Sequence, residues 1–178
     1  SLYAGGSCLI KDSRSLMHQL SGAGQDVSLL NEIYQSNHRQ LNNFLSRAQK
    51  EGGLDWSGKI VSLLGVAFKR DTNDIRNSAS IAVVKFLLNK KVGKIKIYDP
   101  AAIDWFKKIF PESDNIFYTK TEEEAINESD VVLVSTDWPQ FRELDKILLL
   151  SSEKPLLMDG RRILSHKYKE LQNSGFNI

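Results

Sequence analysis

The chain has 178 residues, of which 41% are hydrophobic and 26% charged, enough apolar material for one compact domain with an appended element. The 24 basic side chains barely exceed the 22 acidic ones, and a net charge of +2 indicates neither a nucleic acid nor a membrane surface as a partner. One cysteine and three histidines exclude an internal disulfide and a Cys/His metal cluster of the usual spacing, so we expect no metal site.

The sequence contains no run of about 18 apolar residues and no secretory signal, so we expect neither a membrane span nor export. A lone free thiol suits a reducing cytoplasm, where we expect the protein to reside. The chain opens directly in a loop that contains Gly5 and Gly6. Natural domains seldom begin there, and we therefore expect this chain to be a fragment.

The first part of the chain is predicted to be helical. We expect a short helix over residues 13–20, capped by Asp12 or Ser13, and a Gly-Ala-Gly break after it. A long helix then runs from residue 26 or 28 to about residue 50, and Asn37 fills one gap in its apolar stripe. The stripe consists of Leu30, Ile33, Tyr34, Leu41, Phe44, Leu45 and Ala48. At 1.5 Å per residue such a helix spans roughly 35 Å, and we interpret its stripe as a homodimer interface.

From residue 59 onward, apolar strands alternate with amphipathic helices. The expected strands cover residues 59–69, 94–99, 116–119, 130–136 and 155–160, and the expected helices cover residues 78–88, 103–110, 122–127 and 167–173. This alternation indicates a parallel sheet covered on both faces. The predicted fold class is α/β, with a long central dimerisation helix followed by a doubly wound parallel sheet. We set the boundary between a helical region, 1–55, and a Rossmann-like domain, 56–178.

Ligands of open parallel sheets bind beyond the carboxyl ends of the strands. The loops after the first and fifth strands carry Lys69 and Arg70, and Arg161 and Arg162. These cations pair well with phosphate, and the helix start at Ser78 adds backbone amides. The first strand ends without a G-x-G-x-x-G turn, so the sheet is not of the usual dinucleotide-binding type. Taken alone, the same loops are equally typical of surface loops that are tied together by ion pairs.

The cysteine is a candidate nucleophile. A lone cysteine is more often a small buried hydrophobe. Cys8, however, follows Gly5 and Gly6, which let backbone approach a ligand closely. We expect Cys8 just ahead of a helix start, with Lys11 three residues on, and both features favour a thiolate.

Several strings together resemble one enzyme family. GGSCLIKD, residues 5–12, resembles the active-site GGSC-x-x-KD segment of UDP-glucose and GDP-mannose dehydrogenases. LLGVAFKRDTNDIRNS, residues 63–78, resembles the LG-x-AFK-x-x-T-x-D-x-R-x-S segment of the same family. The strings IYDP, STDWPQFRELD and DGRRIL follow in the order and spacing of the family. The resemblance covers nearly the whole chain.

The resemblance implies an amino-terminal NAD-binding domain, a long dimer-forming helix and a second Rossmann-like domain for the nucleotide sugar, of which this chain has the latter two. It implies oxidation of a sugar C6 alcohol to a carboxylate, with two NAD reduced and a cysteine thiohemiacetal and thioester on the way. The motifs look most like UDP-glucose 6-dehydrogenase. GDP-mannose and UDP-N-acetylhexosamine remain alternative substrates, and a non-catalytic nucleotide-binding and dimerisation module remains an alternative function.

The resemblance also implies roles for individual residues. Cys8 matches the nucleophile, and Asp12 matches the carboxylate that assists proton transfer and water activation. Lys11 and Arg76 match residues near the NAD cofactor. The residues that match nucleotide-sugar contacts are Gly5, Gly6, Phe68, Lys69 and Arg161. Because the other partners in NAD binding lie outside this chain, we expect the fragment alone to be inactive.

Overall fold

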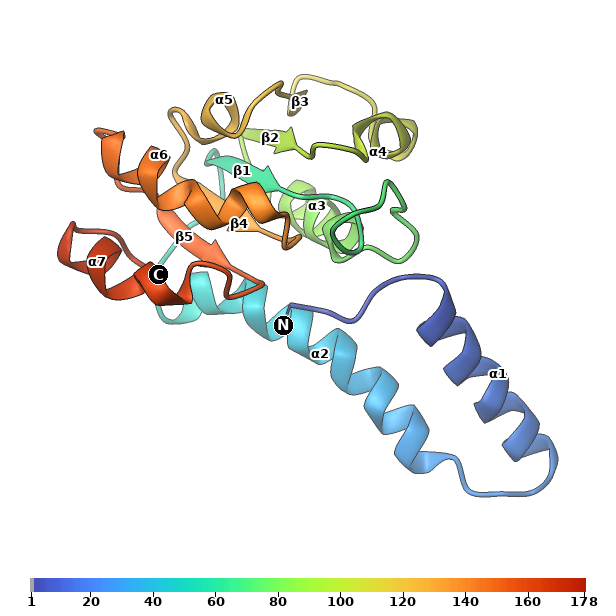
Figure 1. Ribbon diagram of the computed structural model, residues 1–178. Coiled ribbons are helices and arrows are strands. Elements are labelled where there is room, and N and C mark those ends of the chain that lie inside the picture. The colour runs from blue at the N-terminus through green and yellow to red at the C-terminus, as the bar shows by residue number, and fades with distance from the viewer. Residues whose placement is uncertain (1) are drawn as a thin grey trace.

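The computed structural model describes residues 2–178 and has two parts, a helical hairpin and an α/β domain (Figure 1). The hairpin consists of α1, Cys8–Gly22, and the first half of α2, Ser28–Lys50, and it projects away from the sheet. The second half of α2 returns to the domain, where Leu41, Leu45 and Ala48 are buried. The predicted long helix is therefore confirmed. The interpretation of its whole apolar stripe as a dimer interface is wrong for these three residues, because they pack into the core of the same chain.

The first helix is longer than expected, because it begins at Cys8 rather than at residue 13. Ser7 already has helical backbone angles, and the N–H of Lys11 donates to its carbonyl at 3.2 Å. Asp12 therefore lies inside the helix and cannot cap it. The helix also passes through Gly22, and the chain turns only at Gly24, whose φ is +74°. Cys8 is thus the first residue of the helix and does not precede it.

The domain is built on five parallel strands in the order β3-β2-β1-β4-β5. The strands are β1 Ile60–Leu64, β2 Lys94–Tyr98, β3 Ile116–Tyr118, β4 Val131–Val134 and β5 Leu156–Asp159. Val61 pairs with Ile95 of β2 on one side and with Val131 of β4 on the other. The strand order therefore reverses between β1 and β4, and the predicted doubly wound α/β fold is confirmed.

Helices cover both faces of the sheet. The remaining helices are α3 Ala79–Asn89, α4 Ile103–Ile109, α5 Glu122–Ile126, α6 Leu144–Leu150 and α7 Tyr168–Asn173, with 3₁₀ turns at Pro139–Glu143 and Ser165–Lys167. α5 and α6 lie together on one face and α3 on the other (Figure 1). No helix was predicted at α6, although Leu144, Ile147 and Leu148 have helical spacing there. No helix within residues 2–178 is long and apolar enough to cross a membrane.

A buried carboxylate ties three loops together at the carboxyl edge of the sheet. Asp99, directly after β2, has only 3% of its surface exposed. Five donors surround its two oxygens at 2.6 to 3.0 Å, namely the backbone N–H groups of Val66, Ala67, Ala101 and Ala102 and the indole N–H of Trp138. Such charge-assisted hydrogen bonds are among the strong ones, so this edge of the sheet is a rigid platform.

Candidate functional site

The site forms where the glycine loop meets the loop that follows β1. Gly6 has φ +91°, and a Cβ added there would lie 2.8 Å from the Phe68 ring. A Cβ on Gly5 would lie 2.5 Å from the carbonyl oxygen of Asn77. The Asn77 side chain in turn donates to the Gly6 carbonyl at 3.1 Å. Only glycines allow this close approach, which brings Gly5, Gly6 and Phe68 together.

Cys8 stands exposed at the first position of α1. Lys11 and Asp12 follow one turn later, and their side chains pair at 2.7 Å. The hydrogen bond and charge of Asp12 raise the pKa of Lys11, and the charge of a Cys8 thiolate adds a smaller part. The same thiolate contributes to the raised pKa of Arg76, after the larger effect of Asp74. Cys8 therefore lies within electrostatic reach of two cations, one from α1 and one from the loop after β1.

The loop after β1 is held by its own polar groups. Asp74 accepts hydrogen bonds from the Arg76 side chain, Nε at 3.0 Å and Nη2 at 2.8 Å, and from the Arg76 backbone N–H at 2.8 Å, and these bonds lower the pKa of Asp74. The N–H of Phe68 donates to the Asp74 carbonyl at 2.9 Å and closes the loop. Lys69 stays exposed, with its ammonium 5.5 Å from the centre of the Phe68 ring. Lys69 and Arg76 therefore project from a loop of fixed shape.

Arg161 reaches across the sheet from the turn after β5. Its Nε donates to the Ser135 carbonyl at 2.6 Å, and its Nη2 donates to the Phe68 carbonyl at 3.1 Å. The Asp159 carboxylate shapes the turn by accepting hydrogen bonds from the Arg161 N–H and the Tyr168 hydroxyl. Burial lowers the pKa of Arg161, against a smaller opposing effect of Asp137. The structure thus joins Arg161 to the Phe68 loop, although 93 residues separate them along the chain.

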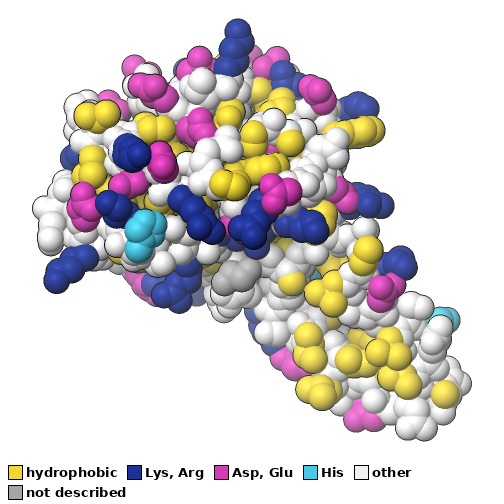
Figure 2. Space-filling view, in the orientation of Figure 1, with side chains coloured by type: hydrophobic (Ala, Val, Ile, Leu, Met, Phe, Trp, Pro, Cys, Tyr) yellow, Lys and Arg dark blue, Asp and Glu magenta, His cyan; other side chains and the backbone are white. Residues whose placement is uncertain are grey.

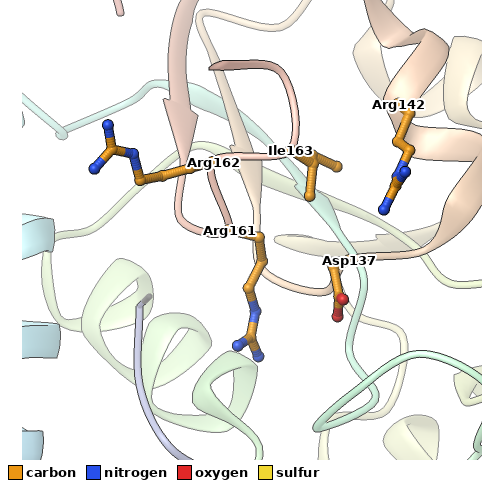
Figure 3. A pocket seen from close by; sticks show the side chains of 5 residues that line it. All are labelled: Asp137, Arg142, Arg161, Arg162 and Ile163. Carbon is orange, nitrogen blue, oxygen red and sulfur yellow. The ribbon is translucent and has the colours of Figure 1, made fainter. Parts of the chain in front are cut away.

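A pocket of about 510 Å³ opens beside Arg161, and it is lined by Asp137, Arg142, Arg161, Arg162 and Ile163. Asp137 and Arg142 follow β4, whereas Arg162 points away from Arg161 (Figure 3). Lys and Arg side chains form a band across this face of the domain (Figure 2). This volume and charge suit a ligand with phosphate groups. Within residues 2–178, no group of three or more His, Cys, Asp or Glu side chains could hold a metal ion.

The sheet itself does not fit a bound dinucleotide. Gly65 ends β1 with φ +87°, and a Cβ there would lie 2.4 Å from Cβ of Thr136, so this turn is already filled. In dinucleotide-binding sheets a carboxylate beyond the second strand contacts the ribose. Asp99 occupies that position, but its oxygens are engaged by five protein donors. This geometry agrees with the missing glycine fingerprint.

Sequence reasoning missed four residues of this region. Asp137 and Arg142 line the pocket, and their position after a parallel strand was a usable signal. Asn77 bonds the glycine loop from the loop after β1. Asn37 bonds the same segment from α2, through both the N–H and the carbonyl of Ala4. A polar residue within an apolar stripe was the only sign of this contact in the sequence.

Comparison with known proteins identifies the domain. Residues 62–166 match the UDP-glucose/GDP-mannose dehydrogenase family, UDP binding domain. A UDP-glucose 6-dehydrogenase of Rickettsia conorii is 32% identical over 164 residues, which are 92% of this chain and 38% of that protein. One of Haloferax volcanii is 33% identical over 163 residues, which are 92% of this chain and 36% of that protein. The chain therefore spans little more than a third of the length of these relatives.

Solved structures have the same fold. A UDP-glucose dehydrogenase from Pyrobaculum islandicum superposes with a TM-score of 0.77 at 23% identity, over 89% of this chain and 34% of that one. A UDP-D-ManNAc dehydrogenase from Pyrococcus horikoshii gives 0.67 at 25% identity, over 91% of this chain and 36% of that one. The domain match covers more than half of the 178 residues and includes the loops after β1, β4 and β5. This chain belongs to the UDP-glucose/GDP-mannose dehydrogenase family and carries its UDP-binding domain.

Proposed function

We propose that this chain is the thiol-bearing and nucleotide-sugar-binding part of an NAD-dependent UDP-glucose 6-dehydrogenase. The observation that carries the proposal is the packing of Gly6 under Phe68, which brings the Cys8 loop to the cationic edge of a UDP-binding domain. The names of the relatives support it. Because this sheet does not fit a dinucleotide, the main NAD site belongs to a part of the protein outside this chain. The exposed thiol of Cys8 is suited to a reducing cytoplasm.

The proposed chemistry uses the thiol as a covalent trap. NAD, when bound, accepts the hydrides that the substrate carbon loses in two oxidations. Each oxidation also releases the proton of the substrate hydroxyl group to water. Between the two oxidations, the Cys8 thiolate adds to the aldehyde carbon, and the carbonyl oxygen takes up a proton to become a hydroxyl group. After the second oxidation a water molecule attacks the thioester carbon and the Cys8 thiolate leaves, so that the product is a carboxylate. Asp12, paired with Lys11 at 2.7 Å, accepts the proton of this water.

The remaining residues bind and orient. Arg161 and Lys69 bring positive charge to the nucleotide sugar, and the glycine loop lies against its sugar ring. Lys11 and Arg76, both exposed near Cys8, are the residues of this chain that would face NAD. The alternative substrates GDP-mannose and UDP-N-acetylhexosamine would use the same thiol chemistry. GDP-mannose differs from UDP-glucose in both the base and the sugar, whereas UDP-N-acetylhexosamine differs in the sugar alone.

Calorimetric titration of this chain tests the proposed binding of the nucleotide sugar. We expect UDP-glucose to bind at least about tenfold more tightly than GDP-mannose. The Arg161→Lys variant keeps the charge but loses the planar fork that reaches Ser135 and Phe68, so its UDP-glucose affinity should fall by about tenfold or more. Arg47→Lys, a change at an exposed arginine that pairs with Glu51 on α2, should bind like the unaltered chain. Equal affinity for both nucleotide sugars, or none for either, would contradict the proposal.

We also propose that two copies pair through α2. Leu29 is 72% exposed and Ile33 is 60% exposed, and they lie four residues apart on one face of the helix. Apolar side chains also gather on the face of the hairpin that is visible in Figure 2. A single copy leaves this apolar surface in water, which a partner helix would remove.

Light scattering tests this pairing. The unaltered chain should have the mass of a dimer at roughly tens of micromolar, and Ile33→Glu should shift it to a monomer because it buries a charge in both halves of the interface. Gln35→Glu adds the same charge at an exposed polar position of α2 and serves as the control. A monomeric mass for the unaltered chain would rule out pairing through α2 alone.

A further inference from the structure

We propose that Asn37 is a positioning residue that holds the Cys8 loop in place from the long helix. Its side-chain oxygen accepts the N–H of Ala4 at 2.8 Å, and its amide nitrogen donates to the carbonyl of Ala4 at 2.9 Å. Asn37 thus satisfies both backbone groups of one residue, as a neighbouring strand would. The inference deepens the proposed function and rests on it, because the position of the loop matters for catalysis only if Cys8 reacts with substrate.

Asn37 occupies a position on α2 at which an apolar residue is expected. Residues four apart form one row along α2, and the row passes from exposed to buried. Leu29 and Ile33 are exposed, whereas Leu41 and Leu45 are 3% and 1% exposed. Asn37 stands at the transition, where a leucine would continue the apolar row. A leucine there would leave the two backbone groups of Ala4 without this partner. The asparagine therefore buries less apolar surface but makes two hydrogen bonds to the loop.

Three contacts hold the segment that leads to Cys8. Leu2, which is 1% exposed, packs against Gly160 in the turn after β5. A Cβ added to Gly160 would lie only 3.1 Å from the Leu2 side chain. Asn37 holds Ala4 from α2, and Asn77 holds Gly6 from the loop after β1. Of these three contacts, the one made by Asn37 comes from the helix of the proposed dimer, from which His38 also packs edge-on against Tyr3 with ring centroids 5.5 Å apart. It therefore ties the thiol loop to α2 as well as to the sheet.

An aspartate substitution gives a test that responds to pH. A protonated carboxyl group has one acceptor oxygen and one O–H donor, the same pattern as the amide, whereas the ionised form has no donor and faces the carbonyl of Ala4. We call the two hydrogen bonds between Asn37 and Ala4 the clamp. Ionisation weakens the clamp, and the pKa of the introduced carboxyl group should therefore be raised. In the Asn37→Asp variant the clamp should persist below that pKa and be lost as the pH rises through it.

Other titratable or charged groups surround the clamp and need a control. They are Tyr34 and His38 on α2, Tyr3 on the clamped segment, Lys85 on α3 and Arg14 on α1. Asn42→Asp adds a carboxylate at an exposed position of the same helix and is measured over the same pH range. Effects that arise from His38 then appear in both variants, whereas loss of the clamp appears only in Asn37→Asp.

Amide hydrogen exchange at Ala4 reads the clamp directly, because Ala4 is exposed and its N–H donates to Asn37. We expect Asn37→Ala to lower the protection factor of this amide by about tenfold, the effect of losing two modest hydrogen bonds. Asn37→Asp should resemble the unaltered chain near pH 4. Near pH 8 its protection factor should fall towards that of Asn37→Ala, because the ionised carboxylate still accepts the Ala4 N–H but has no donor for the Ala4 carbonyl and repels it. Asn42→Asp should match the unaltered chain at both pH values. Circular dichroism at each pH verifies that the variants are folded.

Turnover of the full-length gene product supplies the second readout. At pH 8, Asn37→Asp should lower kcat by about tenfold with KM little changed, and acid pH should reduce the deficit. Unchanged exchange at Ala4 in Asn37→Ala overturns the clamp. Altered exchange at Ala4 with an unchanged kcat overturns the role of Asn37 in the reaction but does not contradict the proposed function. A full-length product without dehydrogenase activity overturns the proposed function, whereas the exchange data still decide the clamp.

Discussion

Replacing Cys8 with serine in the full-length gene product is expected to lower formation of the carboxylate product by about a thousandfold or more. Serine has nearly the same shape, but its hydroxyl group remains protonated at neutral pH and traps the aldehyde carbon poorly. The side chain is exposed, and its sulfur lies 3.8 Å from Ser7 Oγ. Folding and UDP-glucose binding should therefore be unchanged, which separates a chemical defect from a structural one.

The measurement is NADH formation together with quantification of the carboxylate product. Ser15→Ala, at an exposed position of α1, is the control, and its turnover should stay within about threefold. Calorimetry with UDP-glucose verifies that the Cys8→Ser site still binds. Carboxylate formation at the unaltered rate in Cys8→Ser would remove the thiol from the mechanism.

The largest expected effect on stability comes from Asp99. Truncation to alanine leaves four backbone N–H groups and an indole N–H without their acceptor, in a position that is 3% exposed. Unsatisfied buried donors each cost about 1 to 3 kcal/mol, so Asp99→Ala should lower the free energy of unfolding by roughly 4 kcal/mol or more. Asp99→Asn should cost less, about 2 kcal/mol, because one of its two acceptor oxygens remains.

Urea denaturation of this chain measures both changes. Asp114→Ala serves as the control, since Asp114 is an exposed acid in the turn before β3, and its effect should stay within about 0.5 kcal/mol. If Asp99→Ala does not fold, Asp99→Asn still reports on the network. A free energy of unfolding for Asp99→Asn equal to that of the unaltered chain would contradict the stabilising role of this carboxylate.

Much of the architecture is encoded locally. The strands and most helices were predictable because continuous apolar runs such as those of β1 and β4 can be buried only inside a covered parallel sheet. The apolar row of α2 likewise indicated its length, from Ser28 to Lys50. The Gly-Gly-Ser-Cys string marked the thiol loop, since paired glycines permit close backbone approach. Elements with little burial were less predictable, and α1 shows this, because Ile10 is its only buried residue and leaves almost no apolar period.

Tertiary structure decided everything that depends on residues far apart in the chain. Asp99 lies 33 positions from Val66, and Arg161 lies 93 from Phe68, so no local pattern could indicate that they are joined. The same holds for Asn37 and Ala4, which are 33 residues apart. Sequence alone determined which segments form strands and helices, because burial imposes a period on each segment separately. Only the folded chain determined which loops meet, because that follows from the strand order and from how closely the glycines let the backbones approach.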